Sequence, residues 1–236
     1  MLIVGLTGGI ACGKSTVSRR LKQHYEYPVI DADEIARVIV EPGEIAYESI
    51  VEYFGEKIPD LVNSDGSLNR PALGRWVFAN KEDLKMLNSI THPAIRQMIF
   101  KNILYYYLKG YKLCVLDVPL LFESHMDDIC AVTISVVSSK ETQLERLLAR
   151  NPEMSEQDAL NRIKAQMSME DRIGRSDYVI QNNGTLSELY GQLDNLVKAI
   201  EPTFLRTVIE YFPPFAFISA AAVYLSRRWR ASNSKK

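Results

Sequence analysis

The chain has 236 residues, of which 47% are apolar and 24% are charged, and its formal net charge is −1. This ordinary globular composition excludes a collagen-like chain, a largely disordered chain and a membrane protein with many spans. Residues 227–236 contain five lysines and arginines and no acid, so the rest of the chain carries a net charge of −6. We therefore expect no nucleic-acid partner, because binding to a phosphate backbone needs many uncompensated cations.

Five short apolar or β-branched runs predict buried strands, and segments with helical periodicity separate them. The predicted strands are Leu2–Leu6, Val29–Ile30, Leu113–Asp117, Val132–Val137 and Tyr178–Ile180. The predicted helices are Lys14–His24, Ala72–Phe78, Pro93–Lys109, Lys140–Arg150, Ser155–Gln166 and Leu186–Ile200. This alternation is typical of an α/β fold with a parallel sheet covered on both faces. The stretch from about residue 45 to 110 interrupts it, and we interpret that stretch as an inserted helical substrate lobe.

A phosphate-binding pattern lies between the first predicted strand and the first predicted helix. The residues that fit G-x-x-x-x-G-K-[ST] and are predicted to bind the phosphates of a nucleotide are Gly8, Gly9, Ile10, Ala11, Cys12, Gly13, Lys14 and Ser15. In this pattern the backbone N–H groups cradle phosphates, the lysine reaches the β- and γ-phosphates, and the serine hydroxyl binds Mg²⁺. The chain has no N-K-x-D element of the kind that reads guanine, which favours ATP.

Two carboxylates that follow predicted strands are candidates for chemistry. Asp31 with Glu34 resembles a capping box, which would leave Asp33 in the first turn of a helix at the sheet edge where ligands bind. Asp33 is therefore a candidate general base for an attacking hydroxyl, with simple stabilisation of the helix N-terminus as the alternative. Asp117 closes the third predicted strand and is a candidate Mg²⁺ ligand, with a helix cap as the alternative.

Arginines gather between about residues 146 and 175, after the fourth predicted strand. They are Arg146, Arg150, Arg162, Arg172 and Arg175. A helical lid that closed with arginines inward would stabilise the charge of a transferring phosphoryl group and exclude water, and we take Arg146 as its catalytic residue. The alternative is a solvated face on which neighbouring acids pair with the arginines.

Together these elements resemble the dephospho-coenzyme A kinase family over about residues 1–200. The likeness rests on the order and spacing of the blocks VGLTGGIACGKS, VIDADEIAR, LNRPALGRWVF, THP, DVPLLFE and RIKAQMSMEDRIGRSDYVIQNNG. It implies a P-loop kinase fold with three layers, a five-stranded parallel sheet, a helical substrate lobe and a lid. It also implies ATP- and Mg²⁺-dependent phosphorylation of the ribose 3′-hydroxyl of dephospho-CoA, the last step of CoA synthesis.

The resemblance implies roles for individual residues as well. Asp33 falls where the family has its proposed general base, and Asn183 lies in a stretch that resembles the family's adenine-side loop. In the lobe, Arg70, Arg75 and His92 are candidates for gripping the substrate. A kinase for another small hydroxyl or nucleotide acceptor, or a membrane-tethered ATP-binding scaffold without catalysis, is the alternative function.

Residues 201–236 form a tail of different character, in which Tyr211–Ser226 contains no charged residue and arginines follow. Sixteen helical residues span about 24 Å, short of the ~30 Å hydrocarbon core of a bilayer. We weigh a short spanning anchor, a segment that lies on the membrane surface, and a helix packed on the kinase body, and we favour membrane contact through residues 207–230. The expected localisation is cytosol-facing, on the ER or the outer mitochondrial membrane, with association with other CoA-pathway enzymes as a further expectation.

Overall fold

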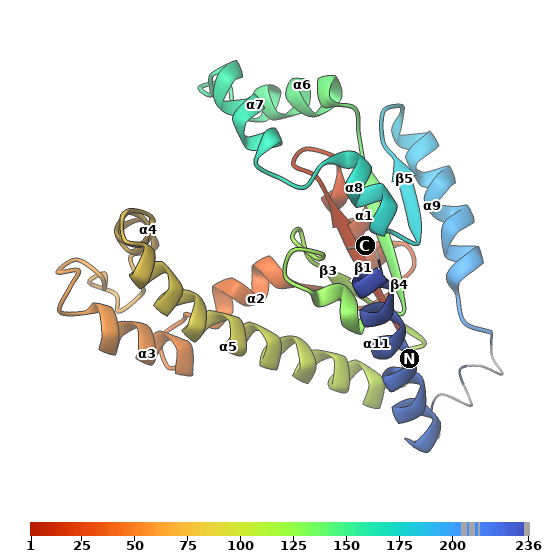
Figure 1. The fold of residues 1–236 in the computed structure, drawn as a ribbon, viewed down its shortest axis with the longest axis horizontal. Helices are drawn as coiled ribbons and strands as arrows, with labels where there is room; N and C mark the ends of the chain where they lie inside the picture. The colour runs from red at the N-terminus through yellow and green to blue at the C-terminus, as the bar shows by residue number, and fades with distance from the viewer. Residues whose placement is uncertain (204–206, 208–210, 212, 234–236) are drawn as a thin grey trace. The chain divides into compact units, whose positions relative to one another are not determined.

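The computed structural model describes residues 1–203, 207, 211 and 213–233 (Figure 1). The chain divides into two compact units. The first contains Met1–Val29 and the chain from Tyr106 onward, and the second contains Ile30–Tyr105. The second unit shares most of its residues with the lobe expected at about 45–110, but it begins earlier, inside the second strand.

The sheet has five strands in the order β2-β3-β1-β4-β5. The strands are β1 (Leu2–Gly8), β2 (Val29–Asp31), β3 (Leu113–Asp117), β4 (Val132–Val137) and β5 (Tyr178–Gln181). β1 pairs in parallel with β3 and β4, and β4 pairs in parallel with β5. Nearly all residues of β1, β3 and β4 are buried, which is why continuous apolar runs mark them in the sequence. The α/β class and all five predicted strands are confirmed.

Two layers enclose this sheet within the first unit. The helices on one face are α1 (Lys14–Gln23) and α9 (Leu186–Ile200). Val17 of α1 and Leu193 of α9 pack in one buried cluster with Val4 of β1. On the opposite face, a Cβ added at Gly5 would lie 2.8 Å from both Cys130 Sγ and Leu121 Cδ2. The connection between β3 and β4 therefore packs directly on the centre of the sheet, at a residue without a side chain.

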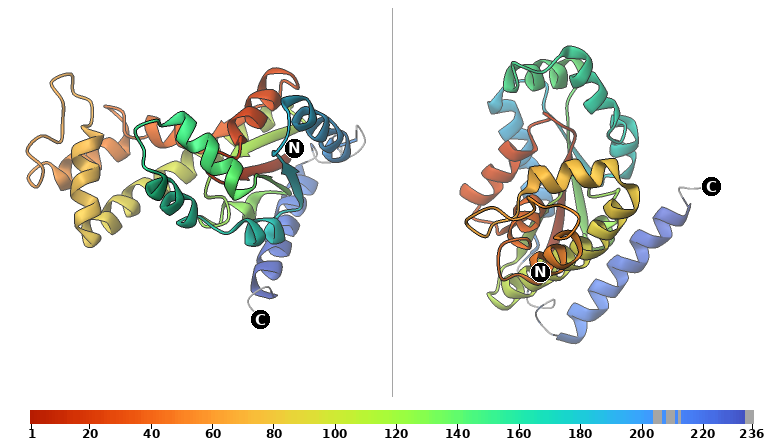
Figure 2. Two further views of the ribbon diagram at one scale, coloured as in Figure 1. Left: turned by 90° about the horizontal axis from the view of Figure 1, so that it is seen from above. Right: turned by 90° about the vertical axis from the view of Figure 1, so that its left-hand side faces the viewer.

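Three helices follow β4 and carry the arginine-rich segment (Figure 2). They are α6 (Lys140–Arg150), α7 (Glu156–Lys164) and α8 (Met169–Arg175). A serine caps each of them, because the hydroxyls of Ser139, Ser155 and Ser168 each accept a backbone N–H three residues along the chain. The helices predicted over Lys140–Arg150 and Ser155–Gln166 are confirmed to within two residues at each end.

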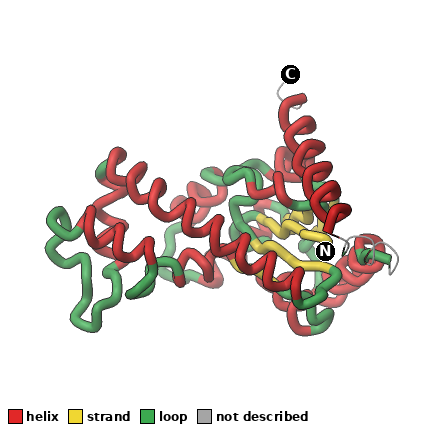
Figure 3. Tube along the Cα trace, turned by 90° about the horizontal axis from the view of Figure 1, so that it is seen from below, coloured by secondary structure: helices red, strands yellow, loops and turns green. Residues whose placement is uncertain are grey.

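The regular structure of the second unit is mostly helical (Figure 3). Its helices are α2 (Ala32–Val38), α3 (Ile45–Phe54), α4 (Arg70–Ala79) and most of α5 (Lys81–Leu108). The carboxylate of Asp83 joins the last three, because it accepts hydrogen bonds from Tyr53 Oη (3.2 Å), Lys57 Nζ (2.7 Å) and Trp76 Nε1 (2.7 Å). The hydrogen bond from Lys57 is the main reason that the pKa of Asp83 lies below its usual range.

Helix α5 corrects one expectation about the lobe. The sequence predicted a helix that begins at Pro93 and ends at Lys109, but α5 begins at Lys81 and runs through His92 and Pro93. A proline removes one i→i−4 hydrogen bond and disfavours the helical conformation of the preceding residue. In a helix of 28 residues, the hydrogen bonds on both sides and the packing of Ile99, which is 1% exposed, outweigh that loss.

The tail contains helix α11 (Pro213–Asn233), which begins at two prolines, where the first turn tolerates them. The tail positions 204–206, 208–210, 212 and 234–236, all inside the predicted tail, lie outside the described residues. Over the part of the chain that the structure describes, no helix is long and apolar enough to cross a membrane.

Within the first unit, the C-terminal half of α11 packs on the segment between β3 and β4 through Arg227, which is only 8% exposed. Its guanidinium donates hydrogen bonds to the carbonyls of Cys130 (3.0 Å) and Ala131 (3.1 Å), and it forms an ion pair with Asp177. The third alternative for the tail, packing on the kinase body, therefore describes this half of the helix.

Candidate active site

The turn between β1 and α1 forms the predicted phosphate loop. Ala11 and Gly13 have φ angles of 58° and 88°, in the left-handed region. Such a turn directs successive N–H groups toward one point, and the N-terminus of α1 adds partial positive charge there. A Cβ at Gly13 would overlap with Asn182 Nδ2, so both its conformation and its neighbour require glycine.

Lys14 opens α1, and its ammonium group forms an ion pair with Asp117. Asp117 is the last residue of β3, which pairs with β1, so the sheet brings together two residues that are 103 positions apart. The side chain of Asp117 is 3% exposed, whereas Ser15, in the first turn of α1, is exposed. Within the described residues, no three His, Cys, Asp or Glu side chains gather as a metal site. Ser15 and Asp117 are the side chains here that could hold a metal, together with oxygens of the substrate.

Two amide side chains from distant segments hold the loop in place. Gln166 Oε1 accepts the N–H of Ile10 at 2.7 Å, and Asn182 Nδ2 donates to the carbonyl of Cys12 at 2.8 Å. Burial raises the pKa of the Cys12 thiol, so this side chain is neutral and adds no negative charge that would repel a bound phosphate. Sequence reasoning placed neither amide at the phosphate loop, because each lies more than 150 residues from it and leaves no local signal.

The arginines of the predicted lid differ in burial. Arg146 is half-buried, and its Nη1 donates to Ser138 Oγ at 3.3 Å. Arg172 is 2% exposed, and its Nη1 donates to Thr7 Oγ1 at 3.0 Å. The remaining members are exposed, as the solvated-face alternative expects: Arg150, Arg162 and Arg175.

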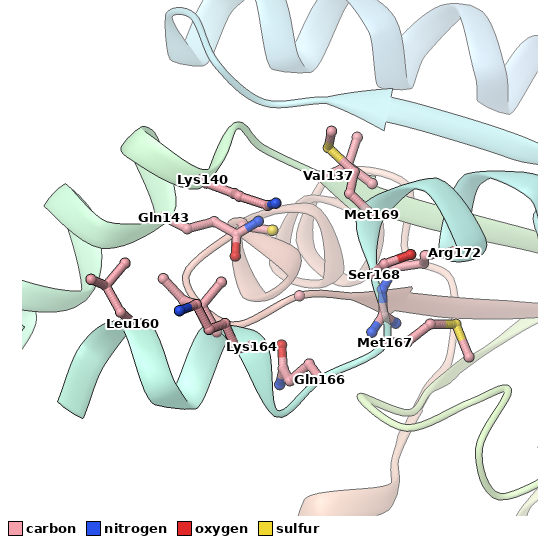
Figure 4. Close-up of a pocket in the computed structure, with 13 residues that line it drawn as sticks. Val137, Lys140, Gln143, Leu160, Lys164, Gln166, Met167, Ser168, Met169 and Arg172 are labelled. Atoms are coloured by element: carbon pink, nitrogen blue, oxygen red, sulfur yellow. The ribbon is translucent and has the colours of Figure 1, made fainter. Parts of the chain in front are cut away.

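A pocket of about 260 Å³ lies between the phosphate loop and helices α6, α7 and α8 (Figure 4). Gly9 and Cys12 line it from the loop. Of its thirteen lining residues, three are cationic and none is acidic; the cations are Lys140, Lys164 and Arg172. Arg146 is not one of the thirteen. This combination of loop amides and cations is suited to a polyphosphate.

Comparison with known proteins agrees with this geometry. The family model for dephospho-CoA kinases matches residues 2–188. Dephospho-CoA kinase CAB5 of Saccharomyces cerevisiae is 63% identical over 227 residues, which are 96% of this chain and 94% of the yeast chain. The chain belongs to the dephospho-CoA kinase family.

More distant members of this family are also similar to the chain in sequence and in structure. The dephospho-CoA kinase of Oceanobacillus iheyensis is 45% identical over 84% of this chain and 96% of its own. The solved structure of the dephospho-CoA kinase from Campylobacter jejuni superposes with a TM-score of 0.65 and 27% identity over 84% of this chain and 96% of its own. The P-loop kinase fold is therefore shown. The family model ends before α11, so the tail helix lies outside the part that defines the family.

The predicted general base of this family member lies in the second unit. Asp31 caps α2 as predicted, because its carboxylate accepts the N–H groups of Asp33 (2.8 Å) and Glu34 (3.2 Å). Asp33 itself occupies the first turn of α2, and its side chain is exposed. The carboxylate of Asp33 is therefore open to a ligand, and its catalytic role stays a prediction.

The residues predicted to bind the substrate and adenine are all exposed. Arg70 Nη2 donates to the carbonyl of Arg37 at 2.7 Å, Arg75 lies in the middle of α4, and His92 lies in the middle of α5. In the first unit, Asn183 Oδ1 accepts the N–H of Ser139 at 2.7 Å, so it ties the loop after β5 to the start of α6. The neighbouring Asn182, and not Asn183, contacts the phosphate loop.

Proposed function

We propose that this member of the dephospho-CoA kinase family transfers the terminal phosphoryl group of ATP to the ribose 3′-hydroxyl of dephospho-CoA, which yields CoA in the last step of its biosynthesis. The observation that carries the transfer from ATP is the phosphate loop, with Lys14 at the start of α1, beside a pocket lined by three cations and no acid. The choice of dephospho-CoA as the acceptor is supported by the membership of the family. A nucleoside triphosphate supplies the negative charge that this pocket lacks.

We assign Lys14 to the phosphates of the nucleotide. We assign Asp117 and Ser15 to Mg²⁺. The ammonium group of Lys14 forms an ion pair with Asp117. Phosphate oxygens would compete for the ammonium group, and the carboxylate would then be released for the metal. Ser15 would supply a hydroxyl ligand from the first turn of α1. Bound Mg²⁺ would neutralise charge that develops on the phosphate oxygens.

Asp33 is assigned the general base and Arg146 a lid contact to the nucleotide phosphates. In the transfer, the 3′-oxygen forms a bond to phosphorus while the bond between phosphorus and the bridging oxygen of ADP breaks. The electron pair of the broken bond leaves with ADP, and the hydroxyl proton passes to the Asp33 carboxylate. No phosphoenzyme is required, because positioning and charge stabilisation are sufficient for this chemistry.

A coupled ADP-release assay with dephospho-CoA as the acceptor tests this function. The unchanged chain is compared with Asp33→Asn and with a reaction without acceptor, and the product mass is measured. We expect a product that is heavier by one phosphoryl group, and we expect Asp33→Asn to lose it while it still binds ATP. Turnover of a nucleoside monophosphate instead would favour the other-acceptor function, and ATP binding without any transfer would favour the scaffold.

We further propose that α11 holds the kinase at the cytosolic face of a membrane, the ER or the outer mitochondrial membrane. Ile218, Leu225 and Trp229 are 63%, 66% and 68% exposed. At about 100° per helical residue, they lie within roughly 20° of the direction opposite to the buried Arg227. An outward apolar stripe beside the exposed Arg228 is typical of a helix that lies in a membrane interface.

Flotation with phosphatidylcholine vesicles, with and without phosphatidylserine, tests the membrane contact. We expect the unchanged chain to float, more so with the anionic lipid, and the triple variant Ile218→Ser, Leu225→Ser, Trp229→Ser to stay in solution with normal kinase activity. Equal flotation of the two chains would contradict the proposal. If neither chain floats and the triple variant instead loses binding to other CoA-pathway enzymes, a protein partner covers this face.

A further inference from the structure

Arg172 is the largest of the fully buried side chains, and it is charged. One of its terminal nitrogens, Nη1, donates to Thr7 Oγ1 at 3.0 Å. The Thr7 hydroxyl in turn donates to the carbonyl of Pro119 at 2.8 Å, so its oxygen is oriented as an acceptor for the guanidinium. This chain of hydrogen bonds fixes Arg172 at the end of β1, directly before the phosphate loop.

The second terminal nitrogen of Arg172 is not satisfied in this way. Among the described residues, Nη2 has no hydrogen-bond partner, and Glu123 Oε1 lies 3.7 Å from it, beyond hydrogen-bond distance. A buried charged donor without an acceptor is unfavourable, because it loses its hydration without replacement. An anionic oxygen of a ligand would supply the missing acceptor.

The surroundings of Arg172 identify that oxygen as one of a phosphate. Arg172 lines the same pocket as Gly9 and Cys12 of the phosphate loop, and the pocket has no acidic lining residue (Figure 4). Gln166, another lining residue, is bonded to the N–H of Ile10, so the segment that leads into α8 is held against the loop.

The ion pairs of the site indicate which phosphate Arg172 meets. Lys14 pairs with Asp117, and Arg172 lies near Glu123, so both cations lie along the segment 117–123 after β3. The lysine of a phosphate loop reaches the β- and γ-phosphates. Arg172, the second cation along the same segment, is therefore suited to contact the terminal phosphate.

We propose that Arg172 is a catalytic residue whose Nη2 donates a hydrogen bond to the terminal phosphoryl group of ATP during its transfer. The inference rests on the ATP-dependent transfer proposed above. As the bond from the acceptor oxygen to phosphorus forms and the bond to ADP breaks, charge spreads over the phosphoryl oxygens, and a fixed guanidinium stabilises it. Thr7 is the positioning residue, because it orients the guanidinium and does not touch the substrate.

The experiment compares Arg172→Lys with Arg175→Lys, a matched control on the same helix that is exposed and outside the pocket lining. We expect Arg172→Lys to lower kcat about 100-fold at saturating substrates, the usual effect of removing one donor to transition-state charge. We expect Arg175→Lys to keep its kcat. Calorimetry without acceptor should show that Arg172→Lys binds ADP normally but binds a non-hydrolysable ATP analogue at least about tenfold more weakly.

Two results separate this role from a purely structural one. Arg172→Ala should regain activity with added methylguanidinium, which a structural loss would not do. The role is overturned if a folded Arg172→Lys keeps kcat within about threefold of the unchanged chain. It is also overturned if the substitution weakens the binding of ADP and of the ATP analogue by the same factor. The binding comparison needs no acceptor, so it reports on Arg172 even if dephospho-CoA is not the substrate.

If the Arg172 variants do not fold, the unchanged chain still decides the question. A crystal structure with ADP, Mg²⁺ and aluminium fluoride, which mimics the transferring phosphoryl group, should place Arg172 Nη2 about 3 Å from a fluoride. A separation beyond about 4 Å in a closed complex would overturn the proposal.

Discussion

Replacing Arg227 by methionine removes the charge that joins α11 to the rest of the first unit and retains an apolar stem of similar length. Arg227 donates to both carboxylate oxygens of Asp177 and to two backbone carbonyls, and it is 8% exposed. Removing one member of a buried ion pair costs about 3–5 kcal/mol when the other member is left without a partner.

The expected cost is smaller here because Asp177 keeps other partners. Its side chain is 24% exposed, and it still accepts from Thr133 N (2.8 Å), Thr133 Oγ1 (2.9 Å) and Arg230 Nη1 (3.2 Å). We therefore expect Arg227→Met to lower the free energy of unfolding by about 2–3 kcal/mol. For a chain of this size, that loss corresponds to a fall in Tm of about 5–10 °C.

Urea unfolding followed by circular dichroism measures this loss. The control is Arg228→Met, since Arg228 is the next residue and is exposed, and it donates a hydrogen bond to Tyr224 Oη of its own helix (3.0 Å). An exposed substitution of this kind changes stability by less than about 0.5 kcal/mol. If Arg227→Met lowers the free energy of unfolding no more than this control does, the ion pair does not hold α11 on the rest of the first unit.

The same pair predicts a dependence on pH. Burial alone would raise the pKa of Asp177, but the hydrogen bonds and charge of Arg227, together with those from Thr133, outweigh it and lower the pKa. The folded carboxylate then binds fewer protons than the unfolded one, whose pKa is about 3.9. Its contribution to stability is present above that value and is lost as the pH falls through the folded pKa. The stability difference between the unchanged chain and Arg227→Met should therefore shrink below about pH 4; a constant difference would contradict this reasoning.

Further predictions concern the site and the second unit. Lys14→Ala should reduce transfer at least about 100-fold in a steady-state assay, and near-normal turnover would remove Lys14 from the mechanism. Gly13→Ala should cost at least about 1–2 kcal/mol in thermal unfolding from backbone strain alone, and should lower ATP affinity in calorimetry because it also displaces Asn182. Asp83→Leu should accelerate hydrogen exchange in α3 and α4, because three donors lose their acceptor, whereas Glu82→Leu, an exposed neighbour, should not.

Local sequence was sufficient to predict the strands that bury continuous apolar runs. β3 and β4 have the predicted bounds, Leu113–Asp117 and Val132–Val137, because strands of a sheet covered on both faces need apolar residues at every position. Helix α9 matches its prediction as well, because Thr185 and Glu188 form a capping box at its start. The phosphate loop could also be predicted from the sequence, because its conformation requires glycines at fixed spacing.

Tertiary structure decided which polar side chains line the pocket beside the phosphate loop. The sequence placed Arg146 and Arg172 in one arginine-rich segment and favoured the former, yet Arg172 is the one that lines the pocket. Its partner Thr7 is 165 residues away, and the partner of Arg227, Asp177, is 50 residues away. A charged side chain can be buried only where distant groups replace its hydration, so its burial is a property of the assembled sheet and not of the local sequence.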